Sequence, residues 1–451
     1  MKITFLGATE TVTGSKYLIT LARNKILVDC GLFQGYKELR LRNWANLPVD
    51  PQSIDAVILT HAHIDHTGYL PLLVKNGFSG KVYCTHATKE LCQILLPDSG
   101  YLQEEEASYA NRKGYSKHSP ALPLYTMLDA VRSLPQLNGC KFGKEYKLFD
   151  DLTFQFNRAG HILGAATVLL KSNGTSLLFS GDLGRPYDPI MLAPDVPQPV
   201  DYLVLESTYG DRSHESQDPL DILAKIINKT VKRGGTIVIP AFAVGRAQSI
   251  LYFIYQLKLN KKIPNIPIFL DSPMAISATE IFCRHAKEHR LTSDQCRQIY
   301  GAVKYIHKVN ESEDLDSMRM PKIIVSASGM ATGGRILHHI QAYAGDHRNS
   351  IVFAGFQAGG TRGDRMVRGE REIKMFGEMV RINAEVISLN NLSAHADREE
   401  ILGWLKQFQT PPRKVFITHG EINASLTLKN NIENTLGWNC IIPKYLQEEK
   451  L

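Results

Sequence analysis

Short apolar runs rich in valine, isoleucine and leucine recur along the N-terminal half of the chain. Their length is typical of strands, and several of them end in glycine, aspartate or histidine. Helical periodicity is clear there only in a block between two groups of strands, at residues 87–96, 102–112 and 121–134. The predicted strands are residues 2–8, 15–21, 25–29, 55–60, 152–157, 166–172, 175–180 and 202–205. Strands are therefore expected to dominate this region.

After about Tyr209 the pattern changes to a strand followed by a helix. Such alternation predicts an open, mainly parallel sheet. Two later strands, residues 386–389 and 414–418, each run into a loop that bears a histidine, so the tail resembles the first region. The strand and helix pairs are residues 236–240 with 247–259, 267–270 with 275–288, and 322–326 with 335–343.

Composition places the chain among ordinary globular proteins. It has 451 residues, of which 43% are hydrophobic and 22% charged, enough for a sizeable core and roughly three folding units. Collagen, mucin and coiled-coil classes are excluded. The net charge of +7 permits an acidic polymer as a partner without requiring one.

The seven cysteines are scattered, and none forms a pair at Cys-x-x-Cys spacing. Neither a disulfide framework nor a thiolate zinc site is indicated, and a reducing cytoplasm fits best. The apolar run at the N-terminus is too short for a signal peptide, and no segment offers the ~18 apolar residues that a membrane span needs. We expect a soluble cytoplasmic protein without membrane contact.

The densest chemical signal follows the apolar strand that ends at Leu59. Within six residues it offers the potential metal ligands His61, His63, Asp65 and His66. In extended backbone the first two project to one side, and the turn that follows directs the other two to a second point nearby, so two adjacent metal ions become feasible. Imidazole and carboxylate ligands suit catalytic zinc, although manganese or iron accept the same set. The alternative is a surface cluster of histidines.

Other candidates lie at the ends of further predicted strands, where functional sites collect. They are Asp29, His161, Asp182 and His419. Taken singly, each is compatible with a turn or capping residue. Taken together with the first four, they complete two coordination shells.

Six of these residues match, in order and context, the ligand motifs of the metallo-β-lactamase superfamily: His61, His63, Asp65, His66, His161 and Asp182. The opening Gly7-Ala8-Thr9-Glu10-Thr11-Val12-Thr13-Gly14-Ser15 and the segment Val28-Asp29-Cys30-Gly31 resemble one branch, the β-CASP nucleases related to the endonuclease of messenger RNA 3′-end processing. The resemblance covers nearly the whole chain. It implies an α/β fold, an αββα sandwich with an inserted β-CASP α/β domain. The expected domains are the first part of the sandwich at residues 1–208, the insertion at 209–382, and the rest of the sandwich at 383–451.

Three later residues resemble the branch's acidic, first-histidine and second-histidine motifs, namely Glu206, His395 and His419. By analogy His395 is a general acid held by Glu206, and Asp65 has a catalytic role besides its role as a ligand. RNA-acting members of the branch have histidine at the last motif where DNA-repair members typically have valine. The resemblance implies two zinc ions per chain, one on His61, His63 and His161 and one on Asp65, His66 and His419, bridged by Asp182 and supported from behind by Asp29.

The implied function is a zinc-dependent ribonuclease that hydrolyses single-stranded RNA through a hydroxide shared by two metal ions. Endonucleolytic cleavage is expected, with 5′-exonuclease action left open. Two rivals are a small-molecule ester or lactam hydrolase on the same fold and a non-catalytic RNA-processing scaffold. The long insertion favours a large phosphate-bearing substrate over the first rival, and the filled ligand positions oppose the second.

Glycine-rich loops in the insertion resemble family loops that close over the substrate. They comprise residues 241–246, 271–274, 326–334 and 355–363. Within them Arg246 and Arg362 are candidates to pair with phosphate, and Ser328 and Thr332 to add hydroxyl contacts. The alternative is ordinary strand-to-helix turn chemistry. By resemblance, a homodimer and RNA-processing protein partners are also compatible with the chain.

Overall fold

The computed structural model describes the chain except for Tyr115, residues 215–216, Phe356 and residues 390–391. Its internal contacts divide it into two compact units. Unit 1 consists of Met1–Ala107, Leu122–Ser213 and Ala394–Leu451, and unit 2 of Ser108–Ala121 and His214–Ser393. Among the described residues, no helix is long and apolar enough to cross a membrane.

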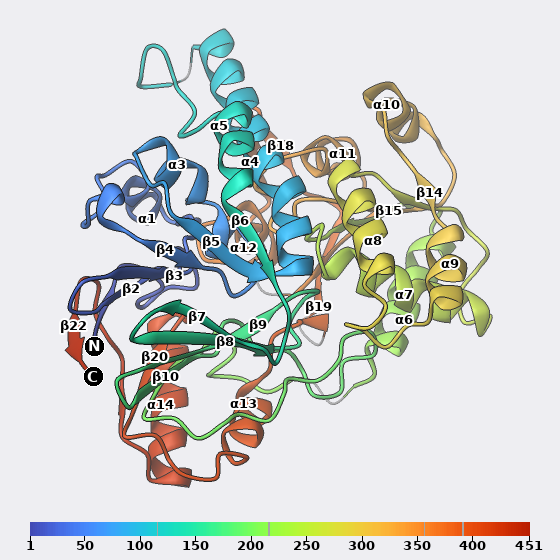
Figure 1. Ribbon diagram of the computed structural model, residues 1–451. Coiled ribbons are helices and arrows are strands. Elements are labelled where there is room, and N and C mark those ends of the chain that lie inside the picture. The colour runs from blue at the N-terminus through green and yellow to red at the C-terminus, as the bar shows by residue number, and fades with distance from the viewer. Residues whose placement is uncertain (115, 215–216, 356, 390–391) are drawn as a thin grey trace. The chain divides into compact units, whose positions relative to one another are not determined.

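Unit 1 is built on two sheets that face each other (Figure 1). In spatial order, the first sheet contains β22 (Glu448–Lys450), β1 (Lys2–Phe5), β2 (Tyr17–Thr20), β3 (Lys25–Val28), β4 (Ala56–Ile58), β5 (Lys81–Thr85) and β6 (Leu137–Cys140). The second contains β21 (Cys440–Ile441), β20 (Lys414–Thr418), β11 (Tyr202–Glu206), β10 (Thr175–Phe179), β9 (Ala166–Ser172), β8 (Leu152–Arg158) and β7 (Glu145–Phe149). Strand β1 pairs with β22, so the two ends of the chain meet in one sheet.

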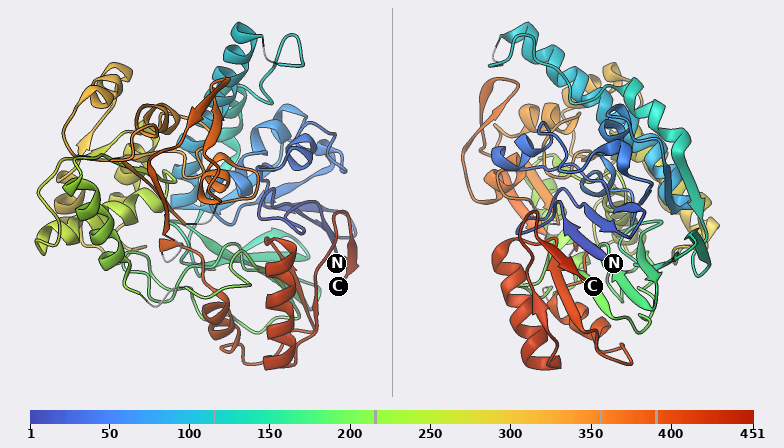
Figure 2. Two further views of the ribbon diagram at one scale, coloured as in Figure 1. Left: turned by 180° about the vertical axis from the view of Figure 1, so that it is seen from behind. Right: turned by 60° about the vertical axis from the view of Figure 1, so that its left-hand side comes forward.

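The facing sheets bury an aromatic core, in which Phe5 packs on Phe416 with ring centroids 5.3 Å apart. Outer faces are covered by helices, as both views of Figure 2 show. On the first sheet these are α1 (Lys37–Arg42), α2 (Ile64–Thr67), α3 (Leu70–Lys75), α4 (His86–Lys113) and α5 (Met127–Ser133), with short 3-10 turns at Pro51–Ser53 and Leu134–Gln136. On the second they are α13 (Arg398–Leu405) and α14 (Ile422–Leu436), which pack Trp404 and Leu428 against it. The expected αββα sandwich is confirmed.

Two local expectations are corrected. The predicted helices 87–96 and 102–112 are one helix, α4, which continues through Pro97. A proline inside a helix is normally disruptive, and here the packing of the helix outweighs that local preference. The predicted helix 121–134 is shorter and begins only at Met127, where Thr126 and Asp129 form a capping box.

Unit 2 carries the predicted parallel sheet. Its helices are α6 (Pro219–Lys232), α7 (Arg246–Leu259), α8 (Pro273–Arg284), α9 (Ser293–Gly301), α10 (Val309–Ser317), α11 (Ile336–Tyr343) and α12 (Arg362–Val367), and β17 (Glu372–Met375) pairs with β18 (Glu378–Arg381). The strand order is β14 (Lys304–Tyr305), β13 (Ile268–Leu270), β15 (Ile323–Ser326), β12 (Ile237–Pro240), β16 (Ser350–Ala354) and β19 (Glu385–Leu389).

Strand β19 differs from its expected place. The sequence grouped residues 386–389 with the C-terminal part of the sandwich, whereas β19 pairs in parallel with β16 in the sheet of unit 2. A short apolar run carries no information about which sheet it joins, and β19 is an edge strand of which only Leu389 is buried.

Candidate metal centre

One edge of the sandwich in unit 1 collects the polar residues predicted at strand ends. Parallel pairing of β3 with β4, and of β10, β11 and β20, brings the carboxyl ends of these strands together. Glu206 is the last residue of β11, and the loops that follow the other strands carry Asp29, the segment His61–His66, Asp182 and His419. The sheet topology therefore gathers residues that lie far apart in the sequence.

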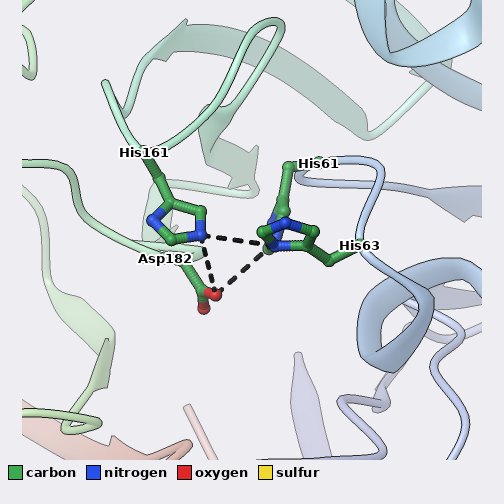
Figure 3. Close-up of side chains that lie close together, drawn as sticks. All are labelled: His61, His63, His161 and Asp182. Atoms are coloured by element: carbon green, nitrogen blue, oxygen red, sulfur yellow. Dashed lines mark hydrogen bonds and ion pairs between the residues drawn. The ribbon is translucent and has the colours of Figure 1, made fainter. Parts of the chain in front are cut away.

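The first cluster consists of His61, His63, His161 and Asp182, which converge on one point (Figure 3). His63 Nδ1 lies 3.1 Å from His61 Nε2 and 3.3 Å from His161 Nε2. Asp182 Oδ2 lies 3.5 Å from His61 Nε2 and 3.7 Å from His161 Nε2.

The second cluster consists of Asp65, His66 and His419. His419 Nε2 lies 3.1 Å from His66 Nε2 and 3.3 Å from Asp65 Oδ2. Asp182 Oδ1 lies 3.3 Å from His66 Nε2. Because its other oxygen faces the first cluster, Asp182 stands between the two groups, where a bridging carboxylate would have to be.

Residues behind the clusters fix the orientation of two rings. His66 Nδ1 donates to Asp29 Oδ2 at 2.7 Å, so Nε2 is the ring atom that faces the cluster. Asp29 also accepts from the Thr60 backbone N–H at 2.7 Å. On the other side, Thr208 Oγ1 lies 3.0 Å from His419 Nδ1. Sequence reasoning missed Thr60 and Thr208, although each is a polar residue two positions after the end of a buried strand.

Burial makes several of these rings good ligands. Burial and neighbouring histidines lower the pKa of His61 and His161 well below the usual value, and burial lowers the pKa of His63 to about 4. Burial alone would raise the pKa of Asp182, but the surrounding histidines hold it well below its usual range. Neutral imidazoles and ionised carboxylates are the forms that bind metals.

The residues present therefore fit metal ions. Two groups of nitrogen and carboxylate donors, each with its candidate ligand atoms within 4.8 Å of one another, match the ligand chemistry of catalytic zinc or of similar divalent ions. A surface histidine cluster does not describe them, because His61, His66, His161 and Asp182 are buried.

His395 and Glu206 form a pair beside the first cluster. His395 Nδ1 lies 3.3 Å from Glu206 Oε1, and its ring centroid lies 4.3 Å from that of His161. Glu206 is buried and also accepts from the Leu183 backbone N–H at 2.6 Å. Burial opposes protonation of His395, but Glu206 outweighs it and raises the pKa of the ring. The capping residue of α13 is Asp397, so capping does not explain His395.

The predicted substrate residues belong to unit 2, whereas the metal-ligand candidates belong to unit 1. Ser328 Oγ and Thr332 Oγ1 are 2.9 Å apart, and Arg362 donates to the Thr332 carbonyl at 3.0 Å. Arg246 begins α7 and is buried. Three of the four are thus joined in one hydrogen-bonded group, in which Arg362 holds loop carbonyls. Phe356, in the fourth glycine-rich loop, lies outside the described residues.

Comparison with known families agrees with this arrangement. Residues 11–125 match the metallo-beta-lactamase superfamily, residues 247–366 the Beta-Casp domain, and residues 379–443 the Zn-dependent metallo-hydrolase RNA specificity domain. A ribonuclease of Thermus thermophilus, TTHA0252, is 35% identical over 436 residues, which cover 95% of each chain. The chain belongs to the β-CASP branch of the metallo-β-lactamase superfamily.

Two further relatives of this β-CASP protein are archaeal. Transcription termination factor FttA of Methanosarcina mazei is 32% identical over 97% of this chain and 69% of its own length. An RNase J-like protein of Methanocaldococcus jannaschii is 29% identical over 97% of each chain. A crystal structure of a protein of unknown function from Enterococcus faecalis V583 shares the fold, with a TM-score of 0.54 at 14% identity over 100% of this chain and 99% of that one.

Proposed function

We propose that this β-CASP protein is a metal-dependent ribonuclease that binds two zinc ions and cuts single-stranded RNA internally. The observation that carries the proposal is the pair of converging donor groups with His395 and Glu206 beside them. Support comes from relatives named as a ribonuclease and an RNase J-like protein, and from the match to an RNA specificity domain over residues 379–443.

Each group has a proposed role. One metal ion would be held by His61, His63 and His161. The other would be held by Asp65, His66 and His419, and Asp182 would bind both ions. When bound, the two ions would supply Lewis-acid polarisation of the phosphodiester and a nucleophile at neutral pH. Asp65 is proposed to serve the reaction as well as to bind metal.

His395 is proposed to protonate the leaving 3′ oxygen. Glu206 raises the pKa of the ring, which favours its charged, proton-donating form. Because Nδ1 faces Glu206, the proton that is transferred comes from Nε2. Glu206 fixes the ring through this contact and keeps its own position through the backbone of Leu183. A group of this kind typically contributes about 10²–10⁴-fold to the rate.

The substrate residues Arg246, Ser328, Thr332 and Arg362 are proposed to contact RNA phosphates through the loops of unit 2. Arg362 would act mainly by holding the loop that carries Thr332. The domain boundaries given above, a 5′-exonuclease activity, a cytoplasmic location, a homodimer and RNA-processing partners stay predictions.

The test combines metal analysis with cleavage of a single-stranded RNA labelled internally and at both ends, alongside the matching DNA. We expect about two zinc ions per chain and internal cuts in RNA. His395→Ala should keep the metal and lose about 10²–10⁴-fold in rate, whereas His347→Ala, at an exposed loop histidine of unit 2, should leave both unchanged.

Two results would contradict the proposal. Loss of metal in His395→Ala would make this residue a ligand rather than a general acid. Retention of metal without any nucleic-acid cleavage, together with hydrolysis of a small ester or lactam, would favour a small-molecule hydrolase on the same fold.

A further inference from the structure

Trp44 is an exposed aromatic residue that has no role in the candidate metal centre. Of the three tryptophans, Trp404 belongs to the core beside the second sheet and Trp438 packs against that core. Trp44 is 58% exposed, and Tyr36, eight residues earlier, is 50% exposed. Large aromatic side chains are normally buried, so two of them exposed on one short segment point to a ligand that covers them.

These aromatics flank helix α1, which has no buried residue. Tyr36 is its N-cap, and the Arg40 backbone N–H donates to the Tyr36 carbonyl at 3.0 Å. The chain then makes a further turn, in which the Trp44 N–H donates to the Leu41 carbonyl at 3.1 Å. Tyr36, Arg40 and Trp44 therefore follow one another at four-residue spacing along this short exposed segment. We call these three residues the aromatic track.

The segment that carries these residues is anchored to the rest of unit 1. The Asn43 side chain is buried and makes two hydrogen bonds with the backbone of Phe33, accepting from its N–H at 2.9 Å and donating to its carbonyl at 2.8 Å. The Arg42 guanidinium lies 4.3 Å from the Tyr445 ring centroid and 5.4 Å from that of Phe33. The aromatic track is therefore presented by a fixed segment, which lowers the entropy cost of binding.

Charge indicates the kind of ligand. The segment contains Lys37, Arg40 and Arg42 but only one acidic residue, Glu38. Exposed aromatic rings interleaved with basic side chains are the surface that stacks bases and follows a phosphate backbone. A protein partner needs no such excess of positive charge.

The track is also tied to the metal centre through the backbone of unit 1. The Cys30 N–H donates to the His66 carbonyl at 2.7 Å, and the Leu32 N–H to the Ile64 carbonyl at 3.0 Å. Only three residues lie between Leu32 and Tyr36, so their Cα atoms are at most about 14 Å apart. Tyr36 is thus only a short stretch of chain away from a residue whose backbone is hydrogen-bonded to the segment of the metal-ligand candidates.

We propose that Tyr36, Arg40 and Trp44 form a stacking site for bases of single-stranded RNA outside the metal centre. This inference rests on the proposed function, since it names a further contact for the same substrate. The site binds by stacking and charge, so it favours single strands over duplexes without reading their sequence.

The test measures binding of the full metal-loaded chain to a 2′-O-methyl oligouridine of about 20 nucleotides, longer than a typical single-strand site. Stacking on Trp44 should quench its fluorescence. Tyr36→Ala and Trp44→Ala should each weaken binding about tenfold, within the usual range for one stacked base, while Trp44→Phe should keep the affinity. With cleavable RNA, both alanine variants should raise KM and leave kcat unchanged.

Tyr101→Ala is the matched control. Tyr101 is also 50% exposed, on helix α4 of the same unit, but it is followed by Glu104, Glu105 and Glu106, which repel RNA. Its loss should leave binding unchanged. All of these side chains are at least half exposed, so none of the substitutions should disturb folding.

The outcomes separate this inference from the proposed function. If the Tyr36→Ala, Trp44→Ala double variant binds RNA as tightly as the wild type, the stacking site is wrong even if cleavage is intact. If that variant instead loses self-association or a protein partner while RNA binding is unchanged, the surface is a protein interface and the inference is overturned. If the wild type binds RNA through the track but never cleaves it, the proposed function fails and the stacking site stands.

Discussion

Replacing Asp29 by asparagine tests how the centre prepares His66 for a metal ion. Asparagine has the same shape and tolerates the positive φ of 57° at this position. Its carbonyl oxygen can still accept from the Thr60 N–H. Its amide nitrogen, however, replaces the oxygen that accepts from His66 Nδ1 at 2.7 Å.

The buried His66 ring must respond to this change. Facing an amide donor, Nδ1 would have to become the acceptor, and the proton would move to Nε2, the atom that lies 3.1 Å from His419 Nε2. Loss of a hydrogen bond to a charged group costs about 1.5–3 kcal/mol. That is about a 10- to 100-fold fall in metal affinity, the range found when partners behind metal ligands are changed.

Competition with a chromogenic chelator measures this affinity. Asp55→Asn is the control, because Asp55 accepts from the Lys25 N–H at 2.8 Å at the opposite end of the same pair of strands, and asparagine keeps that bond. Equal metal affinity in Asp29→Asn and Asp55→Asn would refute the reasoning. The reasoning would also be refuted if Asp29→Asn lost metal affinity only because the whole protein unfolds, even with metal present.

Two further predictions concern stability. Asp397→Ala removes the capping box of α13 and should lower the free energy of unfolding of unit 1 by about 1 kcal/mol in denaturant titration; an unchanged midpoint would contradict this. In unit 2, His339 bonds Asp271 at 2.8 Å and Asp316 at 2.7 Å. Burial lowers its pKa, but these carboxylates outweigh burial and raise it above 6.5. A histidine whose pKa is higher in the folded state stabilises the fold fully at pH values below its pKa in the unfolded chain. This contribution disappears as the pH rises through its pKa in the folded protein. His339→Gln should therefore lose more stability at about pH 6 than at about pH 9; an equal loss at both would rule out a charged His339.

The segment from His61 to His66 shows how much the sequence determines. Its ligand spacing is local, because alternation in a strand and the turn after it fix where the side chains point. The strands that frame it, such as β3 and β9, also follow from short apolar runs. Family motifs then identified Asp182, Glu206, His395 and His419, which the structure gathers around that segment.

Tertiary structure decided what sequence patterns do not encode. Only sheet pairing shows that β19 joins unit 2, because a short apolar run fits the edge of either sheet equally well. Only packing carries α4 through Pro97. The contacts of Asp29 with His66 and of Thr208 with His419 join residues far apart in the chain, and the exposure of Trp44 depends on what the fold leaves uncovered. The spacing of ligands within one segment follows from the order of its residues. The hydrogen-bond partners and the burial of a side chain depend on segments that are far apart in the sequence and meet only in the folded chain.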